Sequence, residues 1–482
     1  MKNLIFIVAY NHENFIDNVL ERLPKDIGNS RYEILIIDDA SKDKTFEKAI
    51  SWGNNHKNIS LKVFKNPKNL GYGGNQKVGF KYAIENKFEN LVLLHGDGQY
   101  APEIIFDLLK FHIKNSNDLT LGSRMIKKMN AIKGGMPLYK FVGNIILTFL
   151  QNKILHSNLS EFHTGYRVYN VEKLNKINFY INTNDFHFDT QTIIQFLINK
   201  FKIGEFAIPT YYGDEISYVN GFKYAYNVIK ESIKSKLQGY GILFDKKYEI
   251  LTEIKYQDKS HFLSTHYYID TLIKSNSSVI DLGYIKSIFH KKLKNKGCFI
   301  KGVNNHNIID EDIYDVYEKC DLNNYIPNDL TNYDYILLLD VIEHLYDPEG
   351  FIENLIKKTN SKQTIIISTG NISFFVIRLM LFFGYFNYGK RGILDKSHTR
   401  LFTPSTFKKI FNDYNFKILK LLGIPAPYPL AFGKNIFSNL LLNINNMLIK
   451  IFPNFFSYQT LLVLQPPVTL EQMLADTIKN KQ

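Results

Sequence analysis

The chain has 482 residues, which is more than one ordinary hydrophobic core supports, so we expect two domains. Its hydrophobic content of 45% and aromatic content of 14% exclude a disordered protein. The formal net charge of +13 favours acidic partners, among them phosphorylated ligands and anionic membrane surfaces, whereas no recognisable module points to nucleic acid.

Three apolar runs near the N-terminus each end in a polar cluster, which predicts buried strands with polar groups at their carboxyl ends. The runs are residues 4–9, 34–37 and 91–94, and the clusters are residues 10–13, 38–43 and 95–103. Helical patterns separate the runs, so they predict a mostly parallel sheet. Because parallel strands end on the same edge of a sheet, we expect the three clusters to lie together.

The third cluster reads HGDGQYAPE. Its carboxylate and side-chain amide are the oxygen ligands that hard divalent cations choose, and magnesium usually shares such ligands with a substrate's phosphates. Pro102 is suited to the first turn of a following helix. The cluster is therefore a candidate site for a metal beneath a diphosphate, although these nine residues alone are more typical of an ordinary polar turn.

Residues 1–245 resemble the family 2 glycosyltransferases, which have the GT-A fold. The resemblance rests on motifs in the family's order: VAYNHE, IIDDASKDKT, NLGYGGN (69–75), HGDGQY, LGSR (121–124), HTGYRVY (163–169), FHFDTQTIIQFL and IPTYYGDEISYVNGFKYA. Within the family, the sequence is most similar to the polyprenyl-phosphate sugar synthases. The resemblance implies an inverting, metal-dependent transfer of a sugar from a nucleoside diphosphate.

The resemblance also implies roles for single residues on the donor side. Asp39 would accept a hydrogen bond from the nucleobase, with Asn11 and Glu13 nearby on the nucleotide. Gly71 and Asn75 belong to the loop over the nucleotide-sugar. Asp97 and Gln99 would hold Mg²⁺ or Mn²⁺ against the diphosphate, where the metal neutralises charge on the leaving group.

On the acceptor side, Arg124 would bind phosphate through its planar fork of donors. Lys140 and Asn144 occupy the positions where the polyprenyl-phosphate branch has a basic residue and a hydroxyl that cradle the acceptor phosphate. A phosphate acceptor needs no general base, whereas a sugar hydroxyl does. The candidates for that base are Asp185, Asp189 and Asp214, and the sequence does not decide among them.

One position departs from the family. His95 stands where the family usually has an acidic residue, so the D-x-D pair becomes H-x-D. A neutral imidazole suits transition metals better than magnesium. His95 is therefore either a third metal ligand or a side chain that packs and hydrogen-bonds beside a metal held by Asp97 and Gln99.

The C-terminal half starts a second alternation of strands and helices, at residues 279–283, 300–304, 335–340 and 365–368. Residues 261–475 resemble the class I S-adenosylmethionine methyltransferases, which have a Rossmann-like fold. The resemblance rests on VIDLG (279–283), YDYILLLDVIEHL (333–345) and NYGKRGILDKSHTRLFT (387–403).

The implied cofactor-binding residues are Asp281 and Gly283, with Asp321 on the adenine side and Asp340 at a central contact. The loop after Gly283 lacks the family's further glycines, since Tyr284 and Lys286 stand there, and Asn304 replaces the acid that would grip the ribose. The domain is therefore either a weakened methyltransferase or a scaffold that no longer binds S-adenosylmethionine.

We expect domains at residues 1–245 and 261–482, joined by a linker at 246–260. The N-terminus begins directly with a strand, and Cys298 and Cys320 form neither a disulfide framework nor a zinc spacing, so a cytoplasmic protein is expected. Residues 372–386 are apolar but too short to span a bilayer. The apolar stripe within residues 436–451 predicts core packing, with an interfacial membrane helix flanked by Lys434 and Lys450 as the alternative.

The leading hypothesis is a glycosyltransferase that uses a nucleotide-sugar donor and a lipid-phosphate or glycan acceptor in surface polysaccharide assembly, with peripheral contact at the inner face of the membrane. One alternative is a bifunctional glycosyltransferase and methyltransferase. Another is a non-catalytic protein that binds a glycan or a nucleotide, which His95 and the altered cofactor loop would explain.

Overall fold

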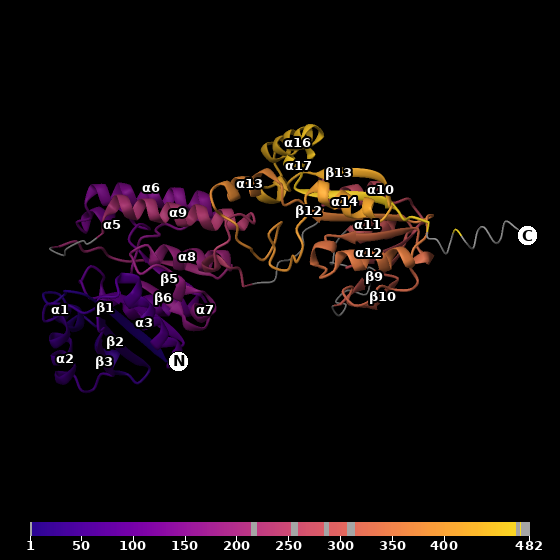
Figure 1. The fold of residues 1–482 in the computed structure, drawn as a ribbon. Helices are drawn as coiled ribbons and strands as arrows, with labels where there is room; N and C mark the ends of the chain where they lie inside the picture. The colour runs from indigo at the N-terminus through magenta and orange to yellow at the C-terminus, as the bar shows by residue number, and fades with distance from the viewer. Residues whose placement is uncertain are drawn as a thin grey trace, which may run out of the picture. The chain divides into compact units, whose positions relative to one another are not determined.

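The computed structural model describes residues 2–213, 219–251, 259–283, 289–305, 314–468 and 473. The chain divides into two compact units, Met1–Glu253 and Ile254–Gln482, and the division falls inside the expected linker (Figure 1). Part of that linker, the short helix η4 (Lys246–Tyr248), packs on the first unit, where the Tyr248 hydroxyl donates to Glu231. The exact domain bounds stay a prediction.

The first unit has a seven-stranded sheet in the order β3-β2-β1-β4-β6-β5-β7. β6 is antiparallel to both of its neighbours, and the other pairs are parallel. The strands are β1 (Asn3–Ala9), β2 (Tyr32–Asp38), β3 (Leu61–Lys65), β4 (Asn90–His95), β5 (Leu119–Ser123), β6 (Arg167–Asn170) and β7 (Ile203–Ala207). The register pairs Ala9 with Asp38 and Val8 with His95, so the three expected clusters do begin at one edge.

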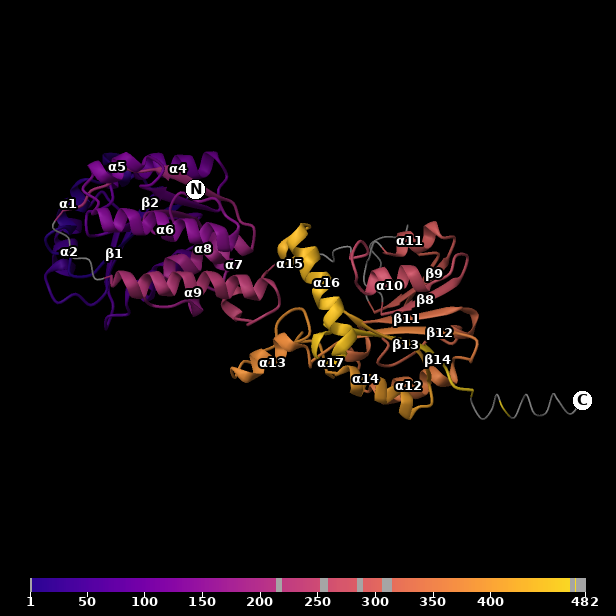
Figure 2. The same cartoon turned by 90° about the horizontal axis from the view of Figure 1, so that it is seen from above.

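Helices cover both faces of this sheet (Figures 1 and 2). They are α1 (Ile16–Glu21), η1 (Lys25–Gly28), α2 (Thr45–Asn55), α3 (Tyr72–Glu85), η2 (Pro102–Ile104), α4 (Ile105–Lys114), α5 (Lys128–Lys133), α6 (Leu138–Leu155), α7 (Val171–Lys176), η3 (Phe179–Ile181), α8 (Phe188–Ile198) and α9 (Gly221–Gly239). Alternate residues of β1 enter two separate cores, which is why the strand is a continuous apolar run. A Cβ on Gly79 would lie 2.1 Å from the Phe6 ring, so glycine is what lets α3 approach β1.

The second unit has its own seven-stranded sheet, in the order β10-β9-β8-β11-β12-β14-β13, in which only β14 runs antiparallel to its neighbours. The strands are β8 (Ser278–Leu282), β9 (Phe299–Asn304), β10 (Val316–Lys319), β11 (Tyr335–Leu339), β12 (Thr364–Gly370), β13 (Lys417–Ile424) and β14 (Gln459–Gln465). The expected α/β fold of both domains is confirmed, and the four expected strands of this half correspond to β8, β9, β11 and β12.

The helices of the second unit are α10 (Thr265–Leu272), α11 (Phe289–Asn295), η5 (Leu330–Asn332), η6 (Ile342–His344), α12 (Pro348–Lys357), α13 (Phe375–Phe382), α14 (Pro404–Asp413), α15 (Tyr428–Phe432), α16 (Ile436–Ile451) and α17 (Pro453–Phe456). Within the described ranges, every helix is too short or too polar to span a bilayer. The expected core packing of α16 is wrong for four stripe residues, because Ile436, Leu440, Ile444 and Ile451 are exposed.

Candidate active site

The first two polar clusters interlock through side chains that accept backbone N–H groups. The amide side chain of Asn11 accepts from the backbone of Lys42 at 3.0 Å, and the carboxylate of Glu13 accepts from the backbone of Lys44 at 2.8 Å. In return, the backbone of Asn11 donates to the hydroxyl of Ser41 at 2.8 Å. Asn11 and Glu13 therefore join the loops after β1 and β2 and help to build the wall of the site.

Asp39 organises the loop that resembles the cover of a nucleotide-sugar. Its buried carboxylate accepts from the backbone N–H of Leu70 at 2.8 Å and of Gly71 at 3.0 Å, and from the side chain of Asn66 at 2.8 Å. Asn75, also buried, donates to the Ile37 carbonyl at 2.9 Å. Gly71 has φ of 80°, a left-handed conformation that favours glycine, and begins α3 there.

Asp97 and Gln99 lie in the turn after β4. The backbone N–H of Gln99 donates to Oδ1 of Asp97 at 3.1 Å, and Oδ2 of Asp97 lies 3.9 Å from Nδ1 of His95. Burial disfavours the charge on Asp97, but His95, His12 and the Gln99 amide together outweigh it and hold the pKa of Asp97 below its ordinary value. Asp97 is therefore a carboxylate at neutral pH, as a metal ligand must be.

His95 belongs to a buried chain of polar contacts. Its Nε2 lies 3.0 Å from the hydroxyl of Tyr72, which donates to Oδ2 of Asp189 at 2.7 Å. Asp189 is 6% exposed, and it also accepts from Gln76 and pairs with Arg167 at 3.4 Å. The His95 ring packs directly on the backbone of Gly165, where a Cβ would lie 2.3 Å from the ring.

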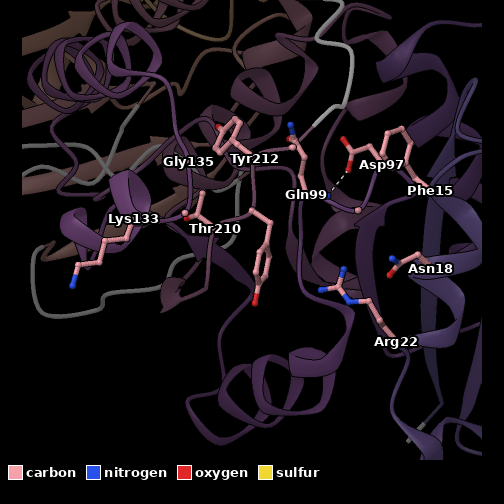
Figure 3. A pocket seen from close by; sticks show the side chains of 13 residues that line it. Phe15, Asn18, Arg22, Asp97, Gln99, Lys133, Gly135, Thr210 and Tyr212 are labelled. Atoms are coloured by element: carbon pink, nitrogen blue, oxygen red, sulfur yellow. Dashed lines mark hydrogen bonds between the residues drawn. The ribbon is translucent and has the colours of Figure 1, made fainter.

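A pocket of about 570 Å³ opens beside Asp97 and Gln99. In Figure 3 these two side chains lie between Phe15, Asn18 and Arg22 on one side and Thr210 and Tyr212 on the other. Arg22 forms two hydrogen bonds with Glu103. Lys133 of α5 also lines the pocket, and Asp97 is the single carboxylate among its described lining residues.

The structure gives Arg124 a protein partner. Its guanidinium pairs with the buried Glu161 and also donates to the His163 carbonyl at 2.8 Å and the Tyr212 hydroxyl at 2.9 Å. The side chain of Asn144 donates to the same Glu161 carboxylate at 2.8 Å. Arg124 and Asn144 therefore both donate to the carboxylate of Glu161, a contact that the sequence did not indicate. Their expected contacts with a phosphate stay predictions.

Lys140 contacts Tyr212, which is also a partner of Arg124, rather than Glu161. Its ammonium stands over the ring of Tyr212, 5.3 Å from the centroid, and Tyr212 lines the pocket. Among the candidate bases, Asp189 has both carboxylate oxygens engaged, whereas the side chain of Asp185 is 38% exposed. Asp214 lies outside the described residues.

In the second unit, the expected cofactor residues are held by other side chains. Oδ2 of Asp281 lies 2.7 Å from Nε2 of the buried His290. Asp340 accepts from Ser368 at 2.8 Å and from Gln459 at 2.6 Å. Both oxygens of Asp321 accept from the neighbouring side chains of Asn323 and Asn324.

The described residues include only the start of the expected cofactor loop. Gly283 has φ of 87°, and a Cβ there would lie 2.3 Å from Val341, so glycine is required. Tyr284 and Lys286 lie outside the described residues. Asn304 uses its side-chain oxygen to accept from the backbone of Asn305 at 2.6 Å.

The sequence reasoning missed several residues of these sites. Tyr72 was hidden inside the glycine-rich loop motif, and Glu161 stands two residues before a recognised motif. Glu343 was visible in VIEHL but had no assigned role. It is buried, and burial together with the nearby charge of Asp340 raises its pKa to about 8.

Comparison with known proteins agrees with the two-unit architecture. The family model "Glycosyl transferase family 2" matches residues 4–177, and a "Methyltransferase domain" model matches residues 253–421. The UDP-N-acetylglucosamine–dolichyl-phosphate N-acetylglucosaminyltransferase of Methanococcus voltae is 31% identical over 219 residues, which are 43% of this chain and 85% of that protein. The dolichol-phosphate mannosyltransferase of Pyrococcus furiosus is 32% identical over 127 residues, covering 26% of this chain and 34% of that protein.

Among solved structures, glucosyl-3-phosphoglycerate synthase from Mycobacterium tuberculosis covers 50% of this chain and 80% of its own, with 13% identity and a TM-score of 0.37. By the matching family model and its mixed seven-stranded sheet, the first unit is a glycosyltransferase domain of α/β type. The chain belongs to the family 2 glycosyltransferases, and its second unit carries a methyltransferase domain.

Proposed function

We propose that the protein transfers a sugar, with inversion, from a nucleoside diphosphate to a lipid phosphate, and that a divalent metal at Asp97 assists. The observation that carries the choice of acceptor is the pocket beside Asp97. A sugar hydroxyl would need a general base, whereas the one carboxylate among the described lining residues, Asp97, is assigned to the metal and the candidate base Asp214 lies outside the described residues. A phosphate is already an anion and needs only positive charge, which Lys133 supplies from the lining and Lys140 from beside Tyr212.

The donor set at Asp97 fits a divalent cation. Asp97 provides an ionised carboxylate, Gln99 an amide oxygen and His95 a ring nitrogen directed at Asp97. Among the described residues no three His, Cys, Asp or Glu side chains form a complete metal cage, so the donor's phosphates would complete the coordination. A bound metal would neutralise charge that develops on the leaving nucleoside diphosphate.

The other residues would position the two substrates. Asp39 holds Leu70 and Gly71 so that their loop closes one side of the donor, and Asn11 and Glu13 fix the opposite loop. Asp189 and Tyr72 keep the His95 ring in place rather than taking a proton from the acceptor, because both oxygens of Asp189 are already engaged. The relatives named for dolichyl-phosphate acceptors support the same acceptor class here.

A lipid acceptor would bring the first unit to a membrane from the cytoplasmic side. The paired helices α6 and α9 support this location, because they expose Tyr139, Phe149 and Phe222. The segment 119–160, which includes α5 and α6, contains no Asp or Glu. Such a surface suits peripheral contact with anionic lipids, next to the pocket that Lys133 lines.

Transfer assays can test this proposal. We would incubate the protein and Mn²⁺ with a panel of nucleotide-sugars, including UDP-N-acetylglucosamine, and offer a short-chain polyprenyl phosphate or the matching polyprenol. The expected result is transfer to the phosphate alone, loss of transfer in EDTA, and a product whose anomeric configuration is opposite to that of the donor. Equal transfer to the polyprenol would contradict a phosphate acceptor, and donor binding without any turnover would favour a non-catalytic binding protein.

A further inference from the structure

Helix α16 of the second unit leaves most of its apolar side chains exposed. The buried residues of α16 are Ser438, Leu442, Asn445 and Ile449, and Asn445 bonds to the backbone of Ala426 and Phe456 at 3.0 and 2.9 Å. The opposite side is apolar and exposed, and Ile436 alone is 89% exposed. A helix of a water-soluble surface normally buries most of its apolar residues, so the exposed apolar side of α16 suits an apolar or interfacial environment outside the protein.

The exposed side of α16 continues onto α13. α17 joins the two, since it packs on α16 and its Phe455 ring stacks on Phe375 of α13 with centroids 6.2 Å apart (Figure 2). At the end of α13, Phe382 is 81% exposed. We call this surface the α13–α16 face, and its exposed apolar residues include Phe382, Phe383, Ile436, Leu440, Met447 and Ile451.

The α13–α16 face has no negative charge. The chain contains 46 Asp and Glu residues, yet residues 354–394 and 414–470, which contribute both helices and α17, contain none. Lys434 and Lys450 stand at the two ends of α16 and are exposed. Among the described residues, no carboxylate pairs with either lysine. An apolar centre with cationic ends and no acid is complementary to an anionic, apolar surface.

We propose that the α13–α16 face docks the second unit on an anionic lipid bilayer. A second copy of the chain is a poorer occupant, because a two-fold interface brings the same patch together and would set lysines against lysines without a carboxylate to pair them. Helix α16 has 16 residues and lies along the unit, so its apolar side would enter the headgroup boundary without spanning the bilayer. This docking extends the membrane contact proposed above for the first unit. It rests on the proposed function only in taking the membrane that holds the lipid acceptor as the surface that is bound.

A fluorescent label on this face tests the proposal directly. Cys298 and Cys320 are buried, so an environment-sensitive dye can be attached to a new thiol in the full chain at Met447→Cys, with Ile50→Cys on α2 as the control. With phosphatidylglycerol-containing vesicles we expect a blue shift at position 447 and none at position 50. No shift at position 447 would overturn the proposal. A shift that follows protein concentration without vesicles would also overturn it and would indicate self-association.

A charge-matched pair of variants gives the second measurement. Leu440→Glu/Met447→Glu places two negative charges on exposed positions of the α13–α16 face, and Ile50→Glu/Phe64→Glu makes the same change in charge on the first unit. We expect the first variant to lose at least about tenfold in partitioning to anionic vesicles and the second to remain near wild type. Equal losses in the two variants would contradict the assignment of the face.

The same variants separate this inference from the proposed function. Transfer to a short, water-soluble polyprenyl phosphate needs no vesicle, so Leu440→Glu/Met447→Glu should retain it. Absence of that transfer in the wild type would refute the proposed reaction and leave the vesicle result standing. Normal transfer together with no response at position 447 would refute only the docking of the second unit.

Discussion

The Tyr72 hydroxyl lies 3.0 Å from Nε2 of His95, and this contact fixes how the histidine faces Asp97. Burial and the nearby Asp189 raise the pKa of Tyr72 well above its ordinary value, so its hydroxyl stays protonated. Its one proton goes to Oδ2 of Asp189, which also lies 3.4 Å from the Arg167 guanidinium. Tyr72 therefore accepts at Nε2, so the His95 ring carries a proton on Nε2, and Nδ1, 3.9 Å from Oδ2 of Asp97, is the nitrogen that can bind a metal.

This tautomer gives the first prediction. Replacing Tyr72 with Phe removes the group that accepts from Nε2–H, so the histidine no longer keeps Nδ1 free for a metal. We expect the Mn²⁺ affinity, measured by electron paramagnetic resonance with a nucleoside diphosphate present, to fall about tenfold. Tyr82→Phe, in the same helix but bonded to Glu33, should leave the affinity unchanged. Equal affinities in wild type and Tyr72→Phe would show that the tautomer has no part in metal binding.

Asp97 carries the second prediction. Asp97→Ala should abolish Mn²⁺ binding and metal-dependent turnover, because no other carboxylate lines the described part of the pocket. The fold should persist, since the side chain of Asp97 contributes no core packing, and circular dichroism can verify this. Turnover at the wild-type level in Asp97→Ala would remove the basis for the metal site.

The exchange His95→Asp restores the residue usual in the family and tests metal choice. An imidazole favours transition metals, whereas two carboxylates favour magnesium. We therefore expect the wild type to prefer Mn²⁺ or Co²⁺ and the variant to gain activity with Mg²⁺ relative to Mn²⁺. Activity titrations with each metal give this ratio, and the same ratio in both proteins would mean that His95 is not a ligand.

The sequence predicted the convergence of the three polar clusters because a local rule governs it. Parallel strands of equal register end together, and β1, β2 and β4 do so. The contacts that hold the site are not local. Tyr72 meets Asp189, which is 117 residues away, and Arg124 meets Glu161, 37 residues away. No periodicity relates such pairs, so a single sequence does not indicate them.

Helix α16 is a second feature that the sequence predicted only in part. Its apolar spacing predicted an amphipathic helix correctly, but spacing does not say which side faces the protein. Asn445 settles that question through hydrogen bonds to Ala426 and Phe456, which the fold brings near, while Gly423 of β13 lets Ile449 approach the sheet. The expected core packing failed for Ile436, Leu440, Ile444 and Ile451 because a different side of the helix, with Leu442, Asn445 and Ile449, faces the protein.

The second unit should bind S-adenosylmethionine weakly or not at all. Asp281 is paired with His290, and Asn304 stands where an acid would hold the ribose hydroxyls. Loss of one charge-assisted hydrogen bond costs roughly 1.5–3 kcal/mol, and the lower figure is about a tenfold loss of affinity. Calorimetry on the full chain is the direct measurement. Low-micromolar binding would show this expectation to be wrong and would favour a bifunctional enzyme.

Glu343 gives a prediction about the pH dependence of stability. Burial, and then the charge of Asp340, raises its pKa in the folded protein to about 8, whereas an unfolded chain has the ordinary value near 4.5. The folded state therefore retains a proton that the unfolded state has released, and stability is lost as the pH rises from about 4.5 to 8. Glutamine is uncharged throughout, so Glu343→Gln should match the wild type near pH 5 and exceed it at pH 8 by a few kcal/mol at most. Thermal unfolding at the two pH values measures this difference.

The control is Glu349→Gln, which changes a partly exposed acid paired with Arg400 and should follow the wild type. Parallel curves for wild type and Glu343→Gln would mean that Glu343 is already ionised in the folded protein.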